Sequence, residues 1–283
     1  MTAATKGRLY LVATPIGNLE DITLRALRVL REVDLIAAED TRHTGKLLQH
    51  FGITTPQLSY HQHNQRQRQA ELLVRLHAGA QIALVTDAGM PGISDPGQEL
   101  VQACIEQGIP VTPIPGCNAA ITALCASGLP TDSFLFLGFL PPKETARRRV
   151  LEQVRAVEAT LIFYEAPHRL GASLATMADV LGRERWCVIA RELTKLHETF
   201  WRGTLQQAAE AFQASPPRGE ITVVVAGAAP RCSLPLEQVQ PEIERLLAQG
   251  CSCREIAQQL AETTGLPRRT LYQLALTCDR RGS

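Results

Sequence analysis

The sequence predicts an α/β protein with two α/β domains followed by a small helical part. Up to residue 114, five short apolar segments alternate with segments of helical period, which is typical of a parallel, doubly wound sheet. From 115 to 229, apolar segments and helical segments follow at less regular spacing. From 235 to 283 only helical patterns remain. We therefore expect domains at 8–114, 115–229 and 235–283.

The composition is that of a globular protein and gives no sign of a membrane protein. The chain has 283 residues and a formal net charge of +1, so its overall charge does not attract it to nucleic acid or membrane. The eight cysteines are scattered in apolar or helical contexts, and no secretory signal or membrane-length apolar run is present. These features favour free thiols in a reducing compartment. We expect a cytoplasmic protein that does not enter a membrane.

The expected strands of the first domain end in polar loops. The strands are predicted at residues 9–13, 34–38, 57–61, 82–85 and 109–114. Parallel strands point the same way, so the loops after them gather at one edge of the sheet, where α/β proteins bind ligands. The polar residues of these loops are Asn18, Glu39, Asp40, Arg42, His43, His61, His63, Asn64 and Asp87. So many hydrogen-bonding side chains predict a polar substrate.

The stretch 82–97 combines a strand with a loop rich in Gly, Pro and Asp. Glycine lets the backbone approach a ligand closely, and Asp87 can accept hydrogen bonds at the strand exit. By itself such a loop is more often a structural turn. Two further loops of similar character, at 14–21 and 113–118, favour a ligand site. Asn18 or Asp21 is expected to cap the helix that follows the first of them.

The second domain also places polar groups at strand exits. Strands are expected at 134–138, 160–164, 186–190 and 221–226, and short strands around Lys195 predict a hairpin and hence a mixed sheet. The exits carry Glu165, His168 and Arg169. The basic run Arg147–Arg149 is either a solvated helix face or a phosphate-binding patch.

The last part of the chain has the pattern of a helix-turn-helix. Pro241 suits a first helical position, and Ser252 with Glu255 forms a capping box. A tight break at 265–267 precedes Arg268 and Arg269. The pattern is compatible with nucleic-acid binding and equally with three helices that simply cap the domain.

Several common sites are excluded by their missing motifs. The chain lacks the glycine fingerprints of dinucleotide and triphosphate sites and the nucleophile elbow of hydrolases. His61 and His63 alternate along an expected strand and would point to opposite faces, which makes them a poor metal pair. We therefore expect no metal. The cluster Glu39–His43 is either an acidic helix N-terminus or a site for substrate binding or proton transfer.

Five motifs together resemble those of the tetrapyrrole methylase family, in particular its members that methylate ribosomal RNA. They are LVATPIGNLEDIT at 11–23, AAEDTRH at 37–43, DAGMPGISDPG at 87–97, FYEAPHR at 163–169 and ARELTK at 190–195. The resemblance runs from about Arg8 to the C-terminus. It implies two α/β domains of the class III methyltransferase type, a dimer, and S-adenosylmethionine bound between the domains. It also implies methylation of a cytidine ribose 2′-hydroxyl in 16S rRNA, in the decoding centre of the small ribosomal subunit.

The resemblance also implies which residues bind the cofactor. They are Asp87, Gly89, Met90, Pro91, Ile93, Pro115, Gly116, Asn118, Ala119, Tyr164, Ala166, Glu192 and Glu220. Met90, Gly92, Cys117 and Asn118 depart from the usual family pattern, which puts single cofactor contacts in question.

Methyl transfer to a ribose hydroxyl needs a base that takes the hydroxyl proton late in the reaction. The candidates are Glu39, Asp40 and His43, with Glu165 and His61 behind them, and the sequence does not choose among them. The expected substrate-binding residues are Asn18, Arg42, His61, Asn64, Arg147, Arg148 and Arg169. Two alternatives remain open: a methyltransferase acting on a tetrapyrrole carbon, and a non-enzymatic nucleic-acid-binding protein.

Overall fold

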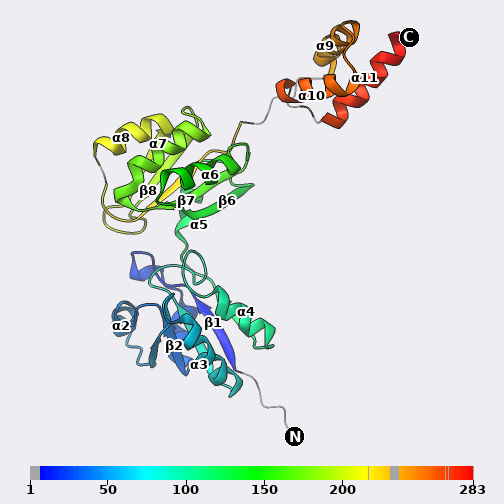
Figure 1. The fold of residues 1–283 in the computed structure, drawn as a ribbon. Helices are drawn as coiled ribbons and strands as arrows, with labels where there is room; N and C mark the ends of the chain where they lie inside the picture. Colours follow the sequence, from blue (N-terminus) through cyan, green and yellow to red (C-terminus); the bar gives the residue numbers. More distant parts are fainter. Residues whose placement is uncertain (1–6, 216, 230–235, 265, 267, 283) are drawn as a thin grey trace. The chain divides into compact units, whose positions relative to one another are not determined.

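The computed structural model describes residues 7–215, 217–229, 236–264, 266 and 268–282 (Figure 1). The chain divides into two compact units, one ending at Ala228 and one starting at Ala229. Both sheets belong to the first unit, so the division predicted at residue 114 stays a prediction. No helix among these residues is long and apolar enough to cross a membrane.

The first sheet is entirely parallel, as predicted. Its strand order is β3-β2-β4-β1-β5. The strands are β1 (Arg8–Val12), β2 (Leu35–Ala38), β3 (Gln57–Ser59), β4 (Gln81–Val85) and β5 (Val111–Ile114). The helices of this part are α1 (Leu24–Glu32), α2 (Thr41–His50), α3 (Gln65–His77) and α4 (Gln98–Glu106), with a short 3-10 helix η1 (Leu19–Asp21).

The two faces of this sheet bury separate hydrophobic clusters. Successive residues of a strand point to opposite faces, so Ala83 and Val85 join one cluster and Ile82 and Leu84 the other. The first cluster contains residues of α1 and α2, and the second contains residues of α3 and α4. Helices on both faces leave the strand ends as the part of the sheet open to a ligand.

The second sheet is mixed, as the predicted hairpin required. Its order is β6-β7-β10-β8-β9; β6 and β7 are parallel and the other neighbours are antiparallel. The strands are β6 (Phe134–Phe139), β7 (Thr160–Glu165), β8 (Trp186–Arg191), β9 (Thr199–Thr204) and β10 (Ile221–Val225). Its helices are α6 (Glu144–Val154), α7 (Leu170–Leu181) and α8 (Leu205–Ala214), with a short 3-10 helix η2 (Pro167–Arg169).

Helix α5 (Ala119–Ser127) connects the two halves of the first unit. It follows β5 of the first sheet, yet its Ala120, Ala123 and Leu124 pack with β-strand residues of the second sheet. Ile16, from the loop after β1, belongs to the same cluster. Helices α6, α7 and α8 share a separate cluster with the opposite face of that sheet.

The C-terminal unit has a core of its own. It consists of α9 (Leu236–Ala248), α10 (Cys253–Thr264) and α11 (Arg268–Gly282), whose apolar residues form one cluster. The predicted capping box is present, since Ser252 and Glu255 exchange side-chain to backbone hydrogen bonds. Pro241 lies inside α9 and not at its first turn, because the helix begins earlier than the proline pattern indicated.

Two local predictions in the first unit are wrong. Asn18 caps η1 by accepting a bond from the Glu20 amide, and Thr23 caps α1, because the short 3-10 turn separates the loop from the helix. Strand β3 ends at Ser59, so His61 lies in a turn closed by the Asn64 side chain, whose Oδ1 accepts from the His61 amide at 2.9 Å. The rings of His61 and His63 therefore lie 5.9 Å apart instead of on opposite faces.

Candidate active site

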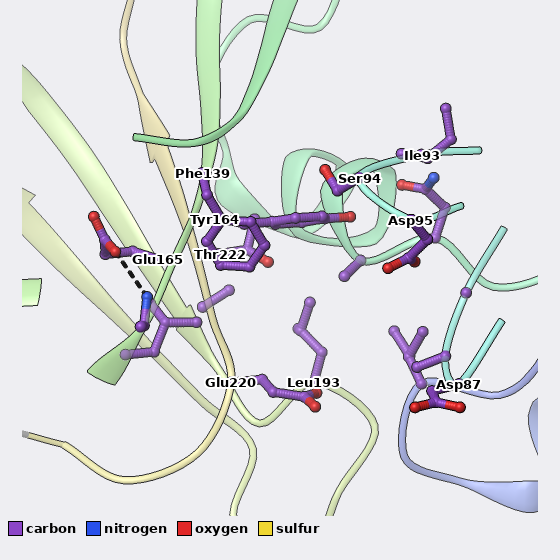
Figure 2. Close-up of a pocket in the computed structure, with 18 of the residues that line it drawn as sticks. Asp87, Ile93, Ser94, Asp95, Phe139, Tyr164, Glu165, Leu193, Glu220 and Thr222 are labelled. Carbon is purple, nitrogen blue, oxygen red and sulfur yellow. Dashed lines mark hydrogen bonds between the residues drawn. The ribbon is translucent and has the colours of Figure 1, made fainter. Parts of the chain in front are cut away.

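A cavity of about 460 Å³ lies between loops of the two sheets within the first unit (Figure 2). Its volume is in the range of small-molecule sites. The first-sheet side contributes Ile16, Glu39, Asp87, Ala88, Gly89, Met90, Ile93, Ser94, Asp95, Asn118 and Ala119. The second-sheet side contributes Phe139, Tyr164, Glu165, Ala166, Pro167, Ala190, Leu193, Gly219, Glu220, Ile221 and Thr222.

The first-sheet wall is built from the exits of neighbouring parallel strands. Because β2 and β4 pair directly, Glu39 and Asp87 lie next to each other. The Asp87 amide donates to Glu39 Oε2 at 3.3 Å, and the Asp40 amide donates to Asp87 Oδ1 at 3.2 Å. Thr14, after β1, exchanges two backbone hydrogen bonds with Gly89, at 2.9 and 3.0 Å. These bonds fix the loops after β1, β2 and β4 to one another.

Three carboxylates belong to this wall, those of Glu39, Asp87 and Asp95, and burial changes the protonation of two of them. Partial burial, together with the charge of Asp87, raises the pKa of Glu39. Burial, and the charges of Glu39 and Asp87, raise the pKa of Asp95 to about 7. Asp95 was not among the predicted site residues, although it belongs to the same loop as Asp87. Figure 2 shows Asp95 and Asp87 on the same side of the cavity.

The second-sheet wall is made of strand ends that meet because β10 is antiparallel to its neighbours. Thr222 pairs with both Tyr164 of β7 and Ala190 of β8, so the start of β10 lies beside the ends of β7 and β8. The Tyr164 hydroxyl accepts a bond from the Ala120 amide at 3.3 Å. Its ring lies against Phe139, with centroids 5.6 Å apart, and burial raises its pKa.

Glu165 lines the cavity, but its carboxylate is fully engaged in structural bonds. Oε1 accepts from the Ala166 amide at 2.8 Å, and from Nε and Nη2 of Arg169 at 2.9 and 2.6 Å. Oε2 accepts from the Ser173 hydroxyl at 2.5 Å. Both oxygens of this carboxylate are therefore occupied by donors of the protein itself. This geometry does not support Glu165 as the base, nor Arg169 as a free phosphate ligand.

A second ion-pair cluster shapes the turn after β8. Lys195 Nζ donates to Glu192 at 2.9 Å and to Glu220 at 3.0 Å, and hydrogen bonding to Lys195 lowers the pKa of Glu192. Glu192 and Thr194 have positive φ angles of 54° and 65°. Glu220 and Leu193 line the cavity while Glu192 does not. Glu192 therefore stabilises the turn through its hydrogen bonds without lining the cavity.

Asp40, Arg42 and His43 lie outside this cavity. The Asp40 side chain caps α2 by accepting the Arg42 amide at 2.8 Å, and it also pairs with the Arg42 guanidinium at 2.7 Å. Hydrogen bonding to Arg42 lowers the pKa of Asp40, which disfavours a role as base. His43 is exposed on the same helix. Of the Glu39–His43 cluster, Glu39 is the member that faces the cavity.

The basic run on α6 does not form one exposed patch, which corrects the prediction for Arg147. Arg147 is only 5% exposed and donates to Thr176 Oγ1 at 3.0 Å and to the carbonyl oxygens of Pro142 and Ala172. The helical period places it on the same buried face as Leu151. Arg148 pairs with Asp179 at 3.0 Å, and Arg149 remains exposed.

Several predicted residues do not line the cavity. Pro91, Pro115, Gly116, Asn18, His61 and Asn64 are absent from its walls. Asn118, one of the departures from the family pattern, caps α5 through its Oδ1 and the Ile121 amide. Residues that line the cavity but were not among the predicted site residues include Ile16, Ser94, Asp95, Phe139, Pro167 and Leu193. Ser94, Pro167 and Leu193 directly follow a predicted residue in the chain, and Phe139 belongs to the 138–142 loop that the sequence placed near the site.

The described part of the chain holds no group of three His, Cys, Asp or Glu side chains that could bind a metal ion. The carboxylates of Glu39, Asp87 and Asp95 line the cavity, where they can attract a cation or accept a proton.

Solved structures with the same fold include methyltransferases. A uroporphyrin-III C-methyltransferase from Thermus thermophilus, complexed with S-adenosylhomocysteine, superposes with a TM-score of 0.55 over 77% of this chain and 97% of that one, at 18% identity. Diphthine synthase superposes with a TM-score of 0.61 over 78% and 90% of the two chains, at 17% identity. The fold is thus that of the class III methyltransferases.

Sequence comparison narrows this class. Residues 8–209 match the family described as Tetrapyrrole (Corrin/Porphyrin) Methylases, and residues 241–278 match the RsmI C-terminal HTH domain. Ribosomal RNA small subunit methyltransferase I of Synechocystis is 58% identical over 98% of this chain and 100% of its own length. The protein of that name from Halalkalibacterium halodurans is 50% identical over 95% and 94% of the two chains. The chain belongs to this family of methyltransferases.

The methyl donor of the enzyme is S-adenosylmethionine, and the cavity fits it. Ile16, Phe139, Tyr164 and Leu193 offer apolar and aromatic surface for an adenosyl group. Asp87, Asp95 and Glu39 offer carboxylates to a cation. Gly89 and Gly219 have φ angles of +82° and +91°, so backbone can approach a ligand there without an intervening side chain.

Proposed function

We propose that this enzyme methylates the ribose 2′-hydroxyl of a cytidine in 16S rRNA, in the decoding centre of the small ribosomal subunit. The relatives that match nearly the whole chain are named for small-subunit ribosomal RNA. One observation supports an oxygen as the atom that is methylated: a candidate base is present. Glu39 is a part-buried carboxylate with a raised pKa in the wall of the larger cavity, where we place the cofactor.

Glu39 is proposed to take the hydroxyl proton. Bound S-adenosylmethionine supplies an electrophilic methyl group, and a ribose hydroxyl attacks it poorly while it keeps its proton. The bond from the Asp87 amide to Glu39 Oε2 orients the carboxylate. Its raised pKa makes it a better proton acceptor than an ordinary exposed carboxylate. Such a base contributes roughly 10²–10⁴-fold to the rate.

Asp95 is proposed to limit the negative charge of the wall. Methyl transfer removes the positive charge of the donor, so a strongly anionic site would stabilise the ground state more than the transition state. With a pKa of about 7, Asp95 is partly protonated near neutral pH. The wall therefore carries less charge than three ionised carboxylates would give it.

Exposed arginines are proposed to hold the RNA backbone. Arg42 and Arg149 in the first unit, and Arg268 and Arg269 at the start of α11, are exposed, and basic side chains bind phosphates with a strong salt dependence. The proposal further includes a homodimer, no metal requirement and a cytoplasmic location. Sedimentation velocity, activity in a chelator and cell fractionation test these three points separately.

The central experiment uses small ribosomal subunits from cells that lack this protein. We expect the purified chain and labelled S-adenosylmethionine to place one methyl group on a cytidine, which mass spectrometry of nuclease fragments would locate. Resistance of the neighbouring phosphodiester to alkali would show that the methyl group is on the 2′-oxygen. A methyl group on a base carbon or nitrogen would overturn the 2′-hydroxyl assignment.

The alternatives predict different results in the same assay. A tetrapyrrole methyltransferase would label uroporphyrinogen III and leave the subunits unlabelled. A non-enzymatic nucleic-acid-binding protein would bind the subunits, and calorimetry would find no affinity for S-adenosylmethionine. Either pattern would refute the proposed function.

A further inference from the structure

A second, smaller cavity adjoins the cofactor cavity on the first-sheet side. Its volume is about 180 Å³, and it is lined by Thr14, Pro15, Leu19, His43, Thr44, Lys46, Leu47, Thr86 and Asp87. Asp87 lines both cavities. The pair of backbone hydrogen bonds between Thr14 and Gly89 also joins a residue of the smaller cavity to one of the larger. A ligand in the smaller cavity would therefore be separated from the larger cavity by little more than Asp87.

Two of the residues that line this cavity carry buried hydroxyl groups with no hydrogen-bond partner among the residues that the structure describes. They are Oγ1 of Thr44 and Oγ1 of Thr86, whose residues are 2% and 1% exposed. The third threonine, Thr14, differs, since its hydroxyl donates to the Thr86 carbonyl oxygen at 3.0 Å. Buried polar groups are nearly always paired, and leaving them unpaired costs stability. Two such groups in one cavity indicate a ligand that pairs with them.

The walls of the cavity indicate the shape of that ligand. Pro15, Leu19 and Leu47 are apolar and suit the face of a flat ring. The threonine hydroxyls can each donate to a ring nitrogen or carbonyl oxygen, or accept from an exocyclic amino group. Lys46 and His43 are exposed residues of the lining and add polar groups from α2. The cavity has less than half the volume of the cofactor cavity, so it suits a single ring.

We propose that this second cavity holds the pyrimidine base of the target nucleotide, turned out of the RNA, with its ribose near Asp87 and Glu39. The inference rests on the proposed function and names the pocket that would select the base. Enzymes that act on one nucleotide within an RNA or DNA strand commonly extrude it into such a pocket and recognise its polar edge there. The hydrogen bonds to Thr44 and Thr86 would compensate for part of the lost stacking.

The test replaces each hydroxyl by a methyl group of the same shape, in Thr44→Val and Thr86→Val. We expect kcat/KM on unmodified small subunits to fall about tenfold for each change, because each variant loses one hydrogen bond to the base. The affinity for S-adenosylmethionine should stay within about twofold of wild type. The melting temperature should stay or rise, because an unpaired buried hydroxyl is removed.

A second readout separates base recognition from a structural role. The methylated cytidine is replaced by uridine or by adenosine in the subunits. The ratio of kcat/KM on the original subunits to kcat/KM on the altered ones measures the base preference of each enzyme. We expect the wild type to prefer a pyrimidine, and the two variants to lose part of that preference. The matched control is Thr160→Val, since Thr160 is also buried but its hydroxyl donates to the Pro130 carbonyl oxygen at 2.7 Å. That variant should melt at a lower temperature and keep the wild-type preference.

The outcomes distinguish this inference from the function on which it rests. If wild type transfers no methyl group to the subunits, the proposed function and this inference both fail. If wild type is active and both threonine variants keep its kcat/KM and base preference, only the pocket assignment is overturned. A lower melting temperature with an unchanged preference would likewise assign the hydroxyls a structural role.

Discussion

The two sheets contribute opposite kinds of wall to the larger cavity, which is lined by residues of both. The first sheet contributes Glu39, Asp87 and Asp95, none of which forms an ion pair with a lysine or arginine among the described residues. The second sheet contributes aromatic rings and backbone, and its acidic residues are matched by cations, Glu165 by Arg169 and Glu220 by Lys195. The carboxylates of one wall have no cationic partner there, and those of the other wall are held in ion pairs.

The contrast arises from how the strands run. In the parallel sheet, β2 and β4 both end at the cavity, so their acidic loops meet. Burial and the charges of neighbouring carboxylates raise the pKa of Glu39 and that of Asp95 there. In the mixed sheet, the start of β10 meets the ends of β7 and β8, and ion pairs join the turns at these ends. A carboxylate in a cavity wall therefore takes its role from its partners rather than from its position.

The strongest effect on activity is expected in the first wall. Glu39→Gln keeps an oxygen that can accept the Asp87 amide but removes the proton acceptor. We expect kcat to fall roughly 10²–10⁴-fold with little change in melting temperature, measured by methyl transfer at saturating subunits. The matched control is Asp40→Asn, which keeps the N-cap of α2 and should stay within about threefold of wild type. Equal losses in both variants would contradict the assignment of the base.

The corresponding change in the second wall should act on stability. Glu165→Ala removes the acceptor for Arg169 and Ser173 and leaves the part-buried guanidinium unpaired. We expect a loss of about 3 kcal/mol in the free energy of unfolding, measured by denaturant titration. Among molecules that remain folded, kcat should be close to that of wild type. A fully stable but inactive variant would show that Glu165 belongs with Glu39.

A glycine in each wall tests how tightly the backbone is held. Gly219→Ala combines a φ of +91° with a Cβ that would collide with the Glu192 carboxyl group, and we expect it to cost about 2 kcal/mol. Gly89→Ala has a φ of +82° but its Cβ would be 3.6 Å from the nearest atom, in Ile16, so about 1 kcal/mol is expected. Thermal unfolding of the two variants measures both costs. The reverse order would mean that the first wall is the more rigid one.

The weakest effect is expected from the pH dependence due to Asp95. Its pKa rises from 3.8 to about 7 on folding, so the folded state binds the proton more tightly than the unfolded state. This contribution to stability is present below the unfolded pKa and is lost as pH rises through the folded one. Asp95→Asn should therefore gain stability relative to wild type from pH 3.8 to about 7, by about 1 kcal/mol after solvent screening. If the melting temperatures of the two proteins, plotted against pH, stay a constant distance apart across this range, the raised pKa of Asp95 is disproved.

Much of the fold could be predicted from the sequence because its periodicity is local information. Apolar strand segments, helical spacing and the Gly/Pro-rich loops indicated the parallel first sheet, the mixed second sheet and the helical C-terminal unit. Boundaries were less certain where a short element intervened, as at η1 before α1. The end of β3 was misplaced because the side chain of Asn64 closes a turn there, and a pattern of alternating residues does not reveal such a bond.

The residues of the candidate site could likewise be predicted in part. The motifs led to Asp87, Gly89, Tyr164 and Glu220, which line the cavity, because polar residues after strands can be read along the chain. They did not separate Glu39 from Glu165, because both follow a strand and both are acidic. Arg147 is a second example. The helical period indicates on which face of α6 it lies, but only its hydrogen bonds to Thr176 and Ala172 show where its guanidinium group is.

The order of residues alone was enough to establish the alternation of strands and helices, the loops at the strand ends and the family of methyltransferases to which the chain belongs. Packing in three dimensions was needed to establish which of the charged side chains are neutralised and which remain free to react. Packing also brings Asp95 beside Glu39 and Asp87, and places Thr44 and Thr86 in one small cavity. The physical reason is that the state of a charge or a buried hydroxyl depends on the groups around it in space, and folding brings those groups together from distant parts of the chain.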